Sequence, residues 1–109
     1  MMRTVHNKLV RDCIPEIIRA SGRECGVEVM EEEKFHQSLR TKLMEEAQEA
    51  AAATDGDLVT ELADLYEVID TLMAASGIDR ETVLKEQKRR QLERGGFSRR
   101  IRLLWSGAD

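Results

Sequence analysis

Aromatic residues, proline and long apolar runs are scarce in this chain of 109 residues. Only 4% of the residues are aromatic, and there is a single proline. No apolar run approaches the roughly 20 residues that are needed to cross a bilayer. The chain is instead rich in Leu, Ala, Glu, Lys and Arg, which favour helix over sheet. The sequence therefore predicts an all-α protein without a membrane span.

Cysteine is also sparse, since only Cys13 and Cys25 occur and they form no C-x-x-C pair. This pattern disfavours a disulfide scaffold or a thiolate zinc site, and reduced thiols are typical of the cytoplasm. The N-terminus has no apolar signal-peptide core, which supports the same location. A chain of this length builds one core, so we expect a single domain over residues 1–109.

The net charge of -4 is unevenly distributed along the chain. Twelve acidic residues lie between Glu31 and Asp70, against three basic ones, whereas nine basic residues follow from Arg80 onward, against four acidic ones. An acidic centre that binds a metal and a basic tail that binds phosphate would explain this pattern. Two solvated faces would explain it equally well.

Apolar periodicity and capping residues predict four helices, over about 12–20, 32–53, 57–76 and 79–94. We expect Asp12, Asp57 and Asp79 to cap three of them, and a tight turn at 54–56 to join the two central helices in an antiparallel hairpin. Two short extended segments, over 24–30 and 97–105, are candidate strands that could pair with each other.

Two acidic pairs fall on or beside the apolar stripes of the central helices. On a helical wheel, five apolar residues lie within about 60° of Glu46: Phe35, Leu39, Leu43, Ala50 and Ala53. Glu49 follows one turn later at the edge of this stripe. Glu61 and Asp64 repeat the arrangement on the next helix, and residues at i and i+3 are neighbours in space.

Ionised carboxylates that enter an apolar interface cost several kcal/mol each unless they are compensated. The stretch between Met44 and Asp79 contains no Lys or Arg, so the local sequence supplies no cation. A hard site of four carboxylates suits Mg²⁺ or Mn²⁺. The absence of a nearby His disfavours zinc and a di-iron site. Plain solvation of these side chains is the alternative interpretation.

Three motifs in order resemble the MazG-like nucleotide pyrophosphohydrolases. The acidic motif is Glu45-Glu46-x-x-Glu49 followed, after eleven residues, by Glu61-x-x-Asp64. The opening NKLVRD at 7–12 with IPEII at 14–18, and the ending ERGGF at 93–97, resemble one branch of that superfamily.

The resemblance implies an all-α helical bundle around the hairpin, and Mg²⁺-dependent cleavage of a nucleoside triphosphate to the monophosphate and pyrophosphate. Many members remove non-canonical or surplus nucleotides, a house-cleaning role, and relatives hydrolyse phosphoribosyl-ATP in histidine synthesis, which is the alternative substrate. The resemblance also implies a metal site and a phosphate site. The metal ligands would be Glu46, Glu49, Glu61 and Asp64, and Glu45 would activate water or be a plain surface residue. The residues expected to bind the substrate are Asn7, Lys8, Arg11, Arg90 and Arg94.

A two-helix hairpin cannot enclose a site alone, so we expect a homodimer or a higher homo-oligomer to complete the bundle. Two other functions remain open at this stage. The basic segment 85–102 could bind nucleic acid, although the net acidic charge and the few aromatics of the chain disfavour this function. The chain could also be a helical dimerisation module without enzymatic activity.

Overall fold

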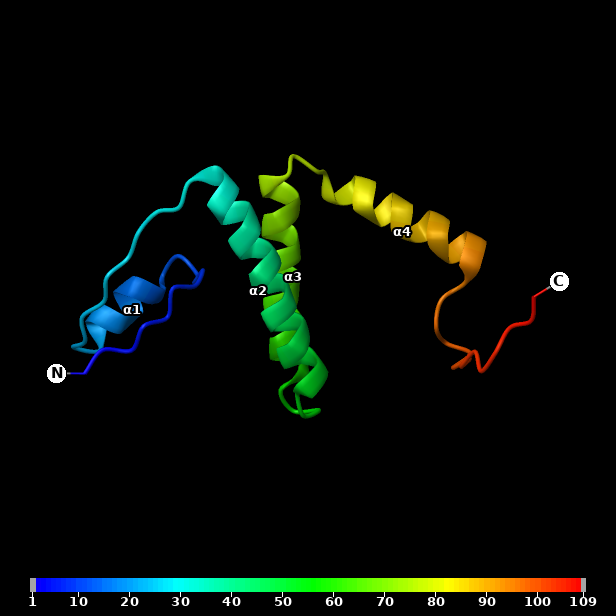
Figure 1. Ribbon diagram of the computed structural model, residues 1–109, viewed down its shortest axis with the longest axis horizontal. Coiled ribbons are helices and arrows are strands. Elements are labelled where there is room, and N and C mark those ends of the chain that lie inside the picture. Colours follow the sequence, from blue (N-terminus) through cyan, green and yellow to red (C-terminus); the bar gives the residue numbers. More distant parts are fainter. Residues whose placement is uncertain (1, 109) are drawn as a thin grey trace. The chain divides into compact units, whose positions relative to one another are not determined.

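The computed structural model describes residues 2–108, and these residues form four helices and no strand. The helices are α1 (Ile14–Ala20), α2 (Glu32–Ala52), α3 (Leu58–Ala75) and α4 (Arg80–Arg94) (Figure 1). Their bounds agree with the predicted ones to within about two residues, and the all-α prediction is confirmed. The chain divides into two compact units, one that ends at Gly77 and one that begins at Ile78.

The helix ends follow the predicted capping positions with one exception. Asp57 and Asp79 occupy the N-cap positions of α3 and α4, although neither side chain makes a capping hydrogen bond. The N-cap of α1 is Cys13 instead of the predicted Asp12, because the Cys13 carbonyl accepts the first helical hydrogen bond, from the Ile17 amide at 3.1 Å. Gly77 follows α3 with φ at +67°, a conformation that glycine adopts without steric cost.

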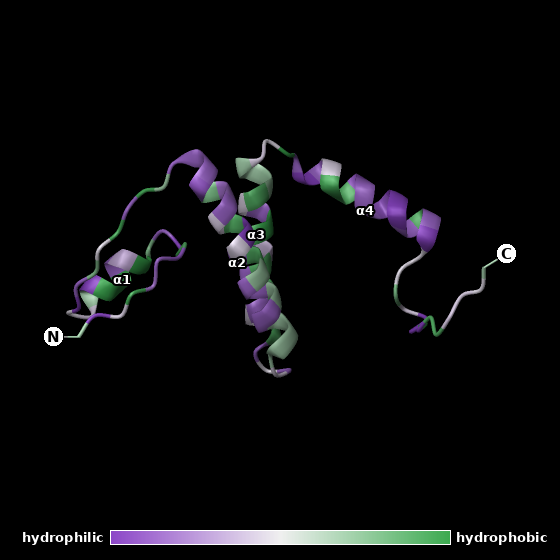
Figure 2. Cartoon of the chain, in the orientation of Figure 1, coloured by the Kyte–Doolittle hydropathy of each residue, from purple (hydrophilic) through white to green (hydrophobic). Residues whose placement is uncertain are grey.

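α2 and α3 pack against each other as the predicted antiparallel hairpin and form the centre of the first unit (Figure 1). The turn between them is closed by the Asp57 amide, which donates to the Thr54 carbonyl at 3.0 Å. Leu39 on α2 and Val68 on α3 are the buried apolar side chains among the described residues. α3 is largely hydrophobic, whereas α4 is hydrophilic over most of its length (Figure 2).

The N-terminal segment of the first unit lies against the hairpin. The Arg11 guanidinium contacts the Asp64 carboxylate on α3 at 2.7 Å, across 53 positions of sequence. Asn7, Lys8 and Leu9 line a common cavity with side chains of α2. This packing brings the predicted phosphate-binding segment beside the acidic helices.

The prediction of two short strands was wrong within the described residues. Residues 24–30 pair with no strand, and Val27 and Val29 are 60% and 99% exposed. The second segment begins with a turn, in which the Arg100 amide donates to the Phe97 carbonyl at 3.1 Å and Arg100 has φ at +58°. A short extended segment is stable as a strand only with neighbouring strands, so partial alternation alone did not suffice.

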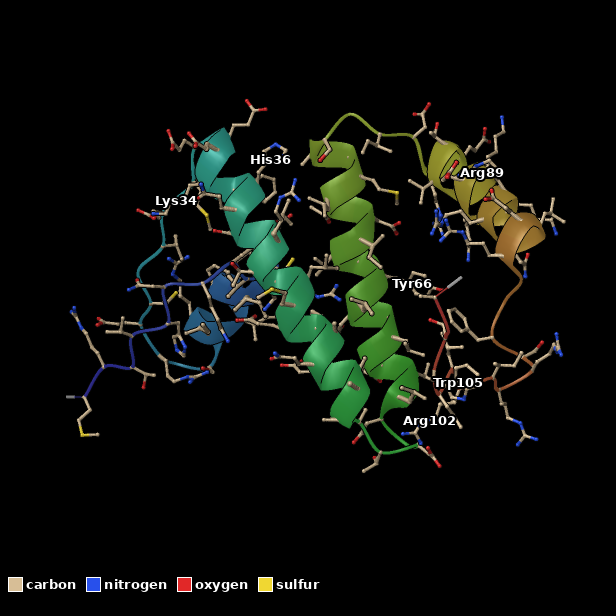
Figure 3. All side chains as sticks on the ribbon, turned by 45° about the vertical axis from the view of Figure 1, so that its right-hand side comes forward. Lys34, His36, Tyr66, Arg89, Arg102 and Trp105 are labelled. Carbon is tan, nitrogen blue, oxygen red and sulfur yellow. The ribbon has the colours of Figure 1, made fainter. Side chains whose placement is uncertain are left out.

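Much apolar surface of the hairpin remains exposed. Val59, Leu62 and Tyr66 share one face of α3 by their spacing and are 79%, 40% and 60% exposed (Figure 3 labels Tyr66). We call this the outer face of α3. Its apolar character agrees with the expectation of a homo-oligomer, which stays a prediction.

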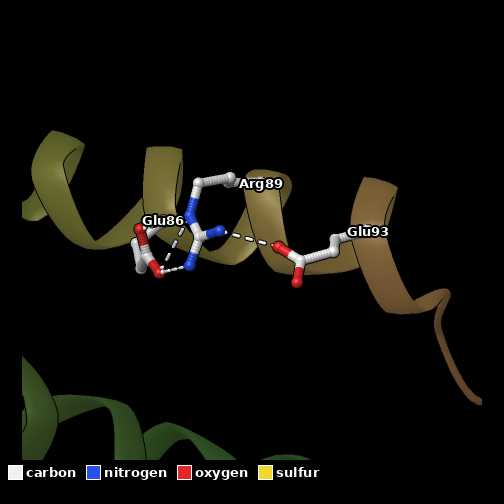
Figure 4. Close-up of polar contacts among 3 residues, drawn as sticks. All are labelled: Glu86, Arg89 and Glu93. Carbon is white, nitrogen blue, oxygen red and sulfur yellow. Dashed lines mark hydrogen bonds and ion pairs between the residues drawn. The ribbon is translucent and has the colours of Figure 1, made fainter.

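The second unit consists of α4 and the segment that follows it. On α4, the Arg89 guanidinium donates to the carboxylates of Glu86 and Glu93, at 3.0 and 2.8 Å, one turn before and one turn after it (Figure 4). The segment that follows α4 leaves its large apolar side chains exposed, among them Trp105, which is 80% exposed (Figure 3). None of the helices described here combines the length and the apolar character of a membrane span.

Candidate metal centre

Three carboxylates converge between the two helices of the hairpin. Glu46 on α2 and Glu61 and Asp64 on α3 each offer one oxygen, and these oxygens lie within 4.8 Å of one another. The i, i+3 spacing makes Glu61 and Asp64 neighbours on one face of α3. The packing of α2 brings Glu46 opposite them. We call this group the acidic cluster.

The acidic cluster is partly withdrawn from water. Glu46 is 7% exposed, and it is the buried charged residue among those that the structure describes. One oxygen of Glu46 and one of Glu61, in both cases Oε2, are buried without a hydrogen-bond partner. Such unpaired buried oxygens are uncommon in folded proteins and require an explanation. The structure thus leaves one acceptor atom without a partner on each of two residues of the acidic cluster.

Burial raises the pKa of both Glu46 and Glu61 above the ordinary value of 4.5. The negative charges of Glu49 and Asp64 raise both pKa values further. Lys42 opposes this rise at Glu46, but only in part. The cluster therefore has an excess of negative charge that its protein neighbours do not neutralise.

Glu49, the fourth predicted ligand, lies at the edge of the acidic cluster. Its side chain is more exposed than those of Glu46 and Glu61. Its charge is close enough to affect both of them, although its oxygens are not among those that lie within 4.8 Å of one another. Glu49 is thus placed to join a ligand set from its open side.

Two cations, Arg11 and Lys42, reach the cluster from outside the stretch between Met44 and Asp79, which contains no Lys or Arg. Arg11 contacts Asp64 at 2.7 Å, and the Lys42 Nζ lies 3.6 Å from Glu46 Oε1 and 3.3 Å from Glu45 Oε2. Neither cation bonds the unpaired oxygens of Glu46 and Glu61. An oxygen-only donor set with residual negative charge fits a hard divalent cation.

A cavity of about 120 Å³ adjoins the cluster on the side of the N-terminal segment. Its lining consists of Asn7, Lys8, Leu9, Ser38, Thr41, Lys42 and Glu45. Asn7 has φ at +45°, a left-handed conformation that Asn tolerates better than most residues. We call this space the N-terminal cavity. It gathers three residues that the resemblance implicated separately, Asn7, Lys8 and Glu45.

The other two predicted substrate-binding residues belong to the second unit. Arg90 and Arg94 are on α4 in the second unit, and their role in binding the substrate stays a prediction. His36 lies near the start of α2 (Figure 3), ten residues before Glu46 and about 15 Å from it along the helix. Its Nε2 is 3.8 Å from Glu32.

Sequence reasoning missed Ser38, Thr41 and Lys42 as candidate site residues. A signal for Lys42 was available, because it precedes Glu46 by four residues on the same helix, a spacing at which side chains meet. For Ser38 and Thr41 the sequence held no comparable signal, since their position depends on where the N-terminal segment packs.

Comparisons with known proteins place the chain in a family. Residues 15–91 match the family described as phosphoribosyl-ATP pyrophosphohydrolase, and this range includes the acidic cluster and Glu49. An uncharacterized protein of Mycolicibacterium smegmatis (strain ATCC 700084 / mc(2)155) is 43% identical over 54 residues, which are 50% of this chain and 55% of that protein. The match thus spans about half the length of this curated relative. No solved structure matches significantly. The chain belongs to the phosphoribosyl-ATP pyrophosphohydrolase family, within the MazG-like superfamily.

Proposed function

We propose that this protein hydrolyses a nucleoside triphosphate to the monophosphate and pyrophosphate with the help of Mg²⁺. The observation that carries the proposal is the acidic cluster, with its two buried, unpaired oxygens. Membership in a pyrophosphohydrolase family supports the reaction class. A purely structural cluster would leave the cost of these oxygens without compensation.

Glu46, Glu61 and Asp64 would hold the cation, and Glu49 would complete the set from its exposed side. Mg²⁺ fits because it prefers carboxylate oxygens and also binds substrate phosphates, and Mn²⁺ accepts the same ligands. When bound, such an ion offsets negative charge on the leaving pyrophosphate and lowers the pKa of a water molecule.

Residues beside the cluster would handle the water and the phosphates. Glu45 lies next to Glu46, is 37% exposed and lines the N-terminal cavity, where its carboxylate can accept a proton from the attacking water. Lys8 and Asn7 would bind phosphate oxygens in the same cavity. Arg11 is 56% exposed and close to Asp64, so it would turn to the phosphates once a metal neutralises that carboxylate.

The substrate is proposed to be a non-canonical or surplus nucleotide. The family description favours a second candidate, phosphoribosyl-ATP, whose hydrolysis breaks the same type of anhydride bond. Both substrates present a triphosphate to the cluster, so the chemistry of the metal centre does not choose between them. The basic residues Arg90 and Arg94 would add phosphate contacts in either case.

Pyrophosphate release provides the direct test. We would measure it with Mg²⁺ and with EDTA, over canonical and modified triphosphates and phosphoribosyl-ATP. The variants are Glu46→Gln and Glu61→Gln, with Glu67→Gln as a matched control on an exposed position of α3. Release that needs Mg²⁺, is lost in both cluster variants and survives in the control would support the proposal. A folded protein that releases no pyrophosphate from any of these substrates would contradict it and favour a non-enzymatic binding module.

We further propose that residues 1–109 act as one functional domain and that two copies associate through the outer face of α3. The exposed apolar side chains of Val59, Leu62 and Tyr66 support this association, because burying them would stabilise a chain with a small core.

A further inference from the structure

We propose that the N-terminal cavity binds one phosphate group of the substrate and that Lys42 is its principal cationic ligand. This inference rests on the proposed function but goes beyond it, because neither the motifs nor the family match assigns a role to Lys42.

The lining of the N-terminal cavity suits a small anion. Its charged members are two lysines, Lys8 and Lys42, and one glutamate, Glu45. Asn7, Ser38 and Thr41 add neutral hydrogen-bonding groups, and Leu9 is the apolar member of the lining. The volume of about 120 Å³ far exceeds the roughly 10–15 Å³ that one water molecule requires. It is well below the 300–1,000 Å³ typical of sites for whole drug-sized ligands, so it fits a single substituent such as a phosphate group.

Lys42 stands at the boundary between this cavity and the acidic cluster. Its side chain is 19% exposed, and its Nζ approaches carboxylates on both sides, Glu45 at 3.3 Å and Glu46 at 3.6 Å. Both contacts are ion pairs without good hydrogen-bond geometry, whereas the surface residue Lys34 on the same helix makes a hydrogen bond of 2.7 Å to Glu28. Lys42 therefore lies between two carboxylates through longer ion-pair contacts and is not committed to one short hydrogen bond.

Metal binding and phosphate binding are coupled through Glu46. A divalent cation on the acidic cluster would neutralise the Glu46 carboxylate, which now attracts Lys42. The ammonium group would then face Glu45 and the cavity, where a phosphate oxygen is a better partner than water. Mg²⁺ should accordingly increase the affinity of the cavity for phosphate, and phosphate should increase the affinity of the cluster for Mg²⁺ by the same factor.

The test measures binding of inorganic pyrophosphate to the full chain by calorimetry, at a fixed Mg²⁺ concentration. We expect Lys42→Met to bind pyrophosphate roughly 10–100-fold more weakly, the effect of losing one hydrogen bond between charged groups. Lys42→Arg keeps the charge and should retain most of the affinity. Lys34→Met removes a lysine from the same helix outside the cavity and should bind like the wild type. A Lys42→Met protein with wild-type affinity would overturn the inference.

A second measurement separates this inference from the proposed function. The melting temperature of Lys42→Met should still rise with Mg²⁺, because the ligands of the acidic cluster are intact. Binding of pyrophosphate that requires Lys42, without turnover of any nucleotide, would support the cavity and contradict the enzyme. If Lys42→Met does not fold, Lys42→Gln answers the same question, since it removes the ammonium charge and keeps a polar side chain at this 19% exposed position. A wild type that binds no pyrophosphate at any Mg²⁺ concentration would also overturn the inference.

Discussion

Replacing Glu46 by Gln should stabilise the protein without metal and abolish its stabilisation by Mg²⁺. Glu46 is 7% exposed, and its Oε2 has no hydrogen-bond partner. The charges of Glu49 and Asp64 oppose its ionisation, while Lys42 at 3.6 Å compensates only partly. Gln has the same shape without the charge, and its amide can donate to the neighbouring carboxylates. The variant thus removes a repulsion that the folded state now contains.

The gain in stability without metal and the loss of stabilisation by Mg²⁺ have opposite signs and similar sizes. An unsatisfied buried polar atom costs about 1–3 kcal/mol, so relief of part of this cost should stabilise the metal-free variant by about 1 kcal/mol. In a domain of this size, 1 kcal/mol raises the melting temperature by about 4–8 °C. For the wild type, Mg²⁺ at ten times its Kd adds about 1.4 kcal/mol. The variant should lack this gain, because it has lost a charged ligand.

Thermal unfolding followed by circular dichroism at pH 7.5 measures both effects. The melts are recorded in EDTA and over a series of Mg²⁺ concentrations, at one protein concentration, since association also affects the melting temperature. Glu67→Gln, the same change at an exposed position of α3, controls for the loss of one negative charge. A lower melting temperature of Glu46→Gln in EDTA, or a Mg²⁺ response equal to that of the wild type, would refute the reasoning.

Three further predictions concern pH, an ion pair and association. The raised pKa values of Glu46 and Glu61 mean that the folded state binds more protons than the unfolded state, so the free energy of unfolding without metal should fall as the pH rises from 4.5 through the raised values. Urea unfolding at several pH values across this range measures the decrease in the free energy of unfolding, which saturating Mg²⁺ should make smaller. The same dependence on pH with and without Mg²⁺ would contradict this prediction. Arg11→Gln breaks the ion pair with Asp64, whose side chains are 56% and 35% exposed, so the free energy of unfolding by urea in EDTA should fall by less than about 1 kcal/mol. A much larger decrease would mean that this ion pair anchors the N-terminal segment. Tyr66→Glu places a charge on the outer face of α3 and should shift the protein toward monomer in light scattering, whereas an unchanged mass would place any association elsewhere.

The helices were the most predictable part of the fold. Apolar periodicity and the turn at 54–56 located α2 and α3 to within about one residue, and the helical wheel correctly placed Glu46 on the inward face of α2, which also carries the buried Leu39. These features depend on residues that are close in sequence. The two proposed strands failed for the complementary reason, because a strand requires a partner that may be any distance away in the chain, and local alternation at 24–30 does not supply one.

The sequence predicted the three carboxylates of the acidic cluster, but not the cations that lie beside them. The i, i+3 spacing and the hairpin together bring Glu61 and Asp64 toward Glu46, and both features are visible in the sequence. The absence of Lys and Arg between Met44 and Asp79 pointed to a cluster without cationic neighbours. In the structure two cations reach it from outside that stretch, Lys42 from the preceding turn of α2 and Arg11 from the N-terminal segment.

The sequence by itself determined four helices, an antiparallel hairpin and acidic pairs on or beside its inward faces, because a helical repeat of 3.6 residues sets these features locally. Only the tertiary structure decided that Arg11 meets Asp64 across 53 positions and that Asn7, Lys8 and Leu9 line a cavity together with side chains of α2. These contacts depend on how a segment without regular secondary structure packs against the helices. No periodicity encodes such packing, and it is this packing that places a candidate phosphate site beside the acidic cluster.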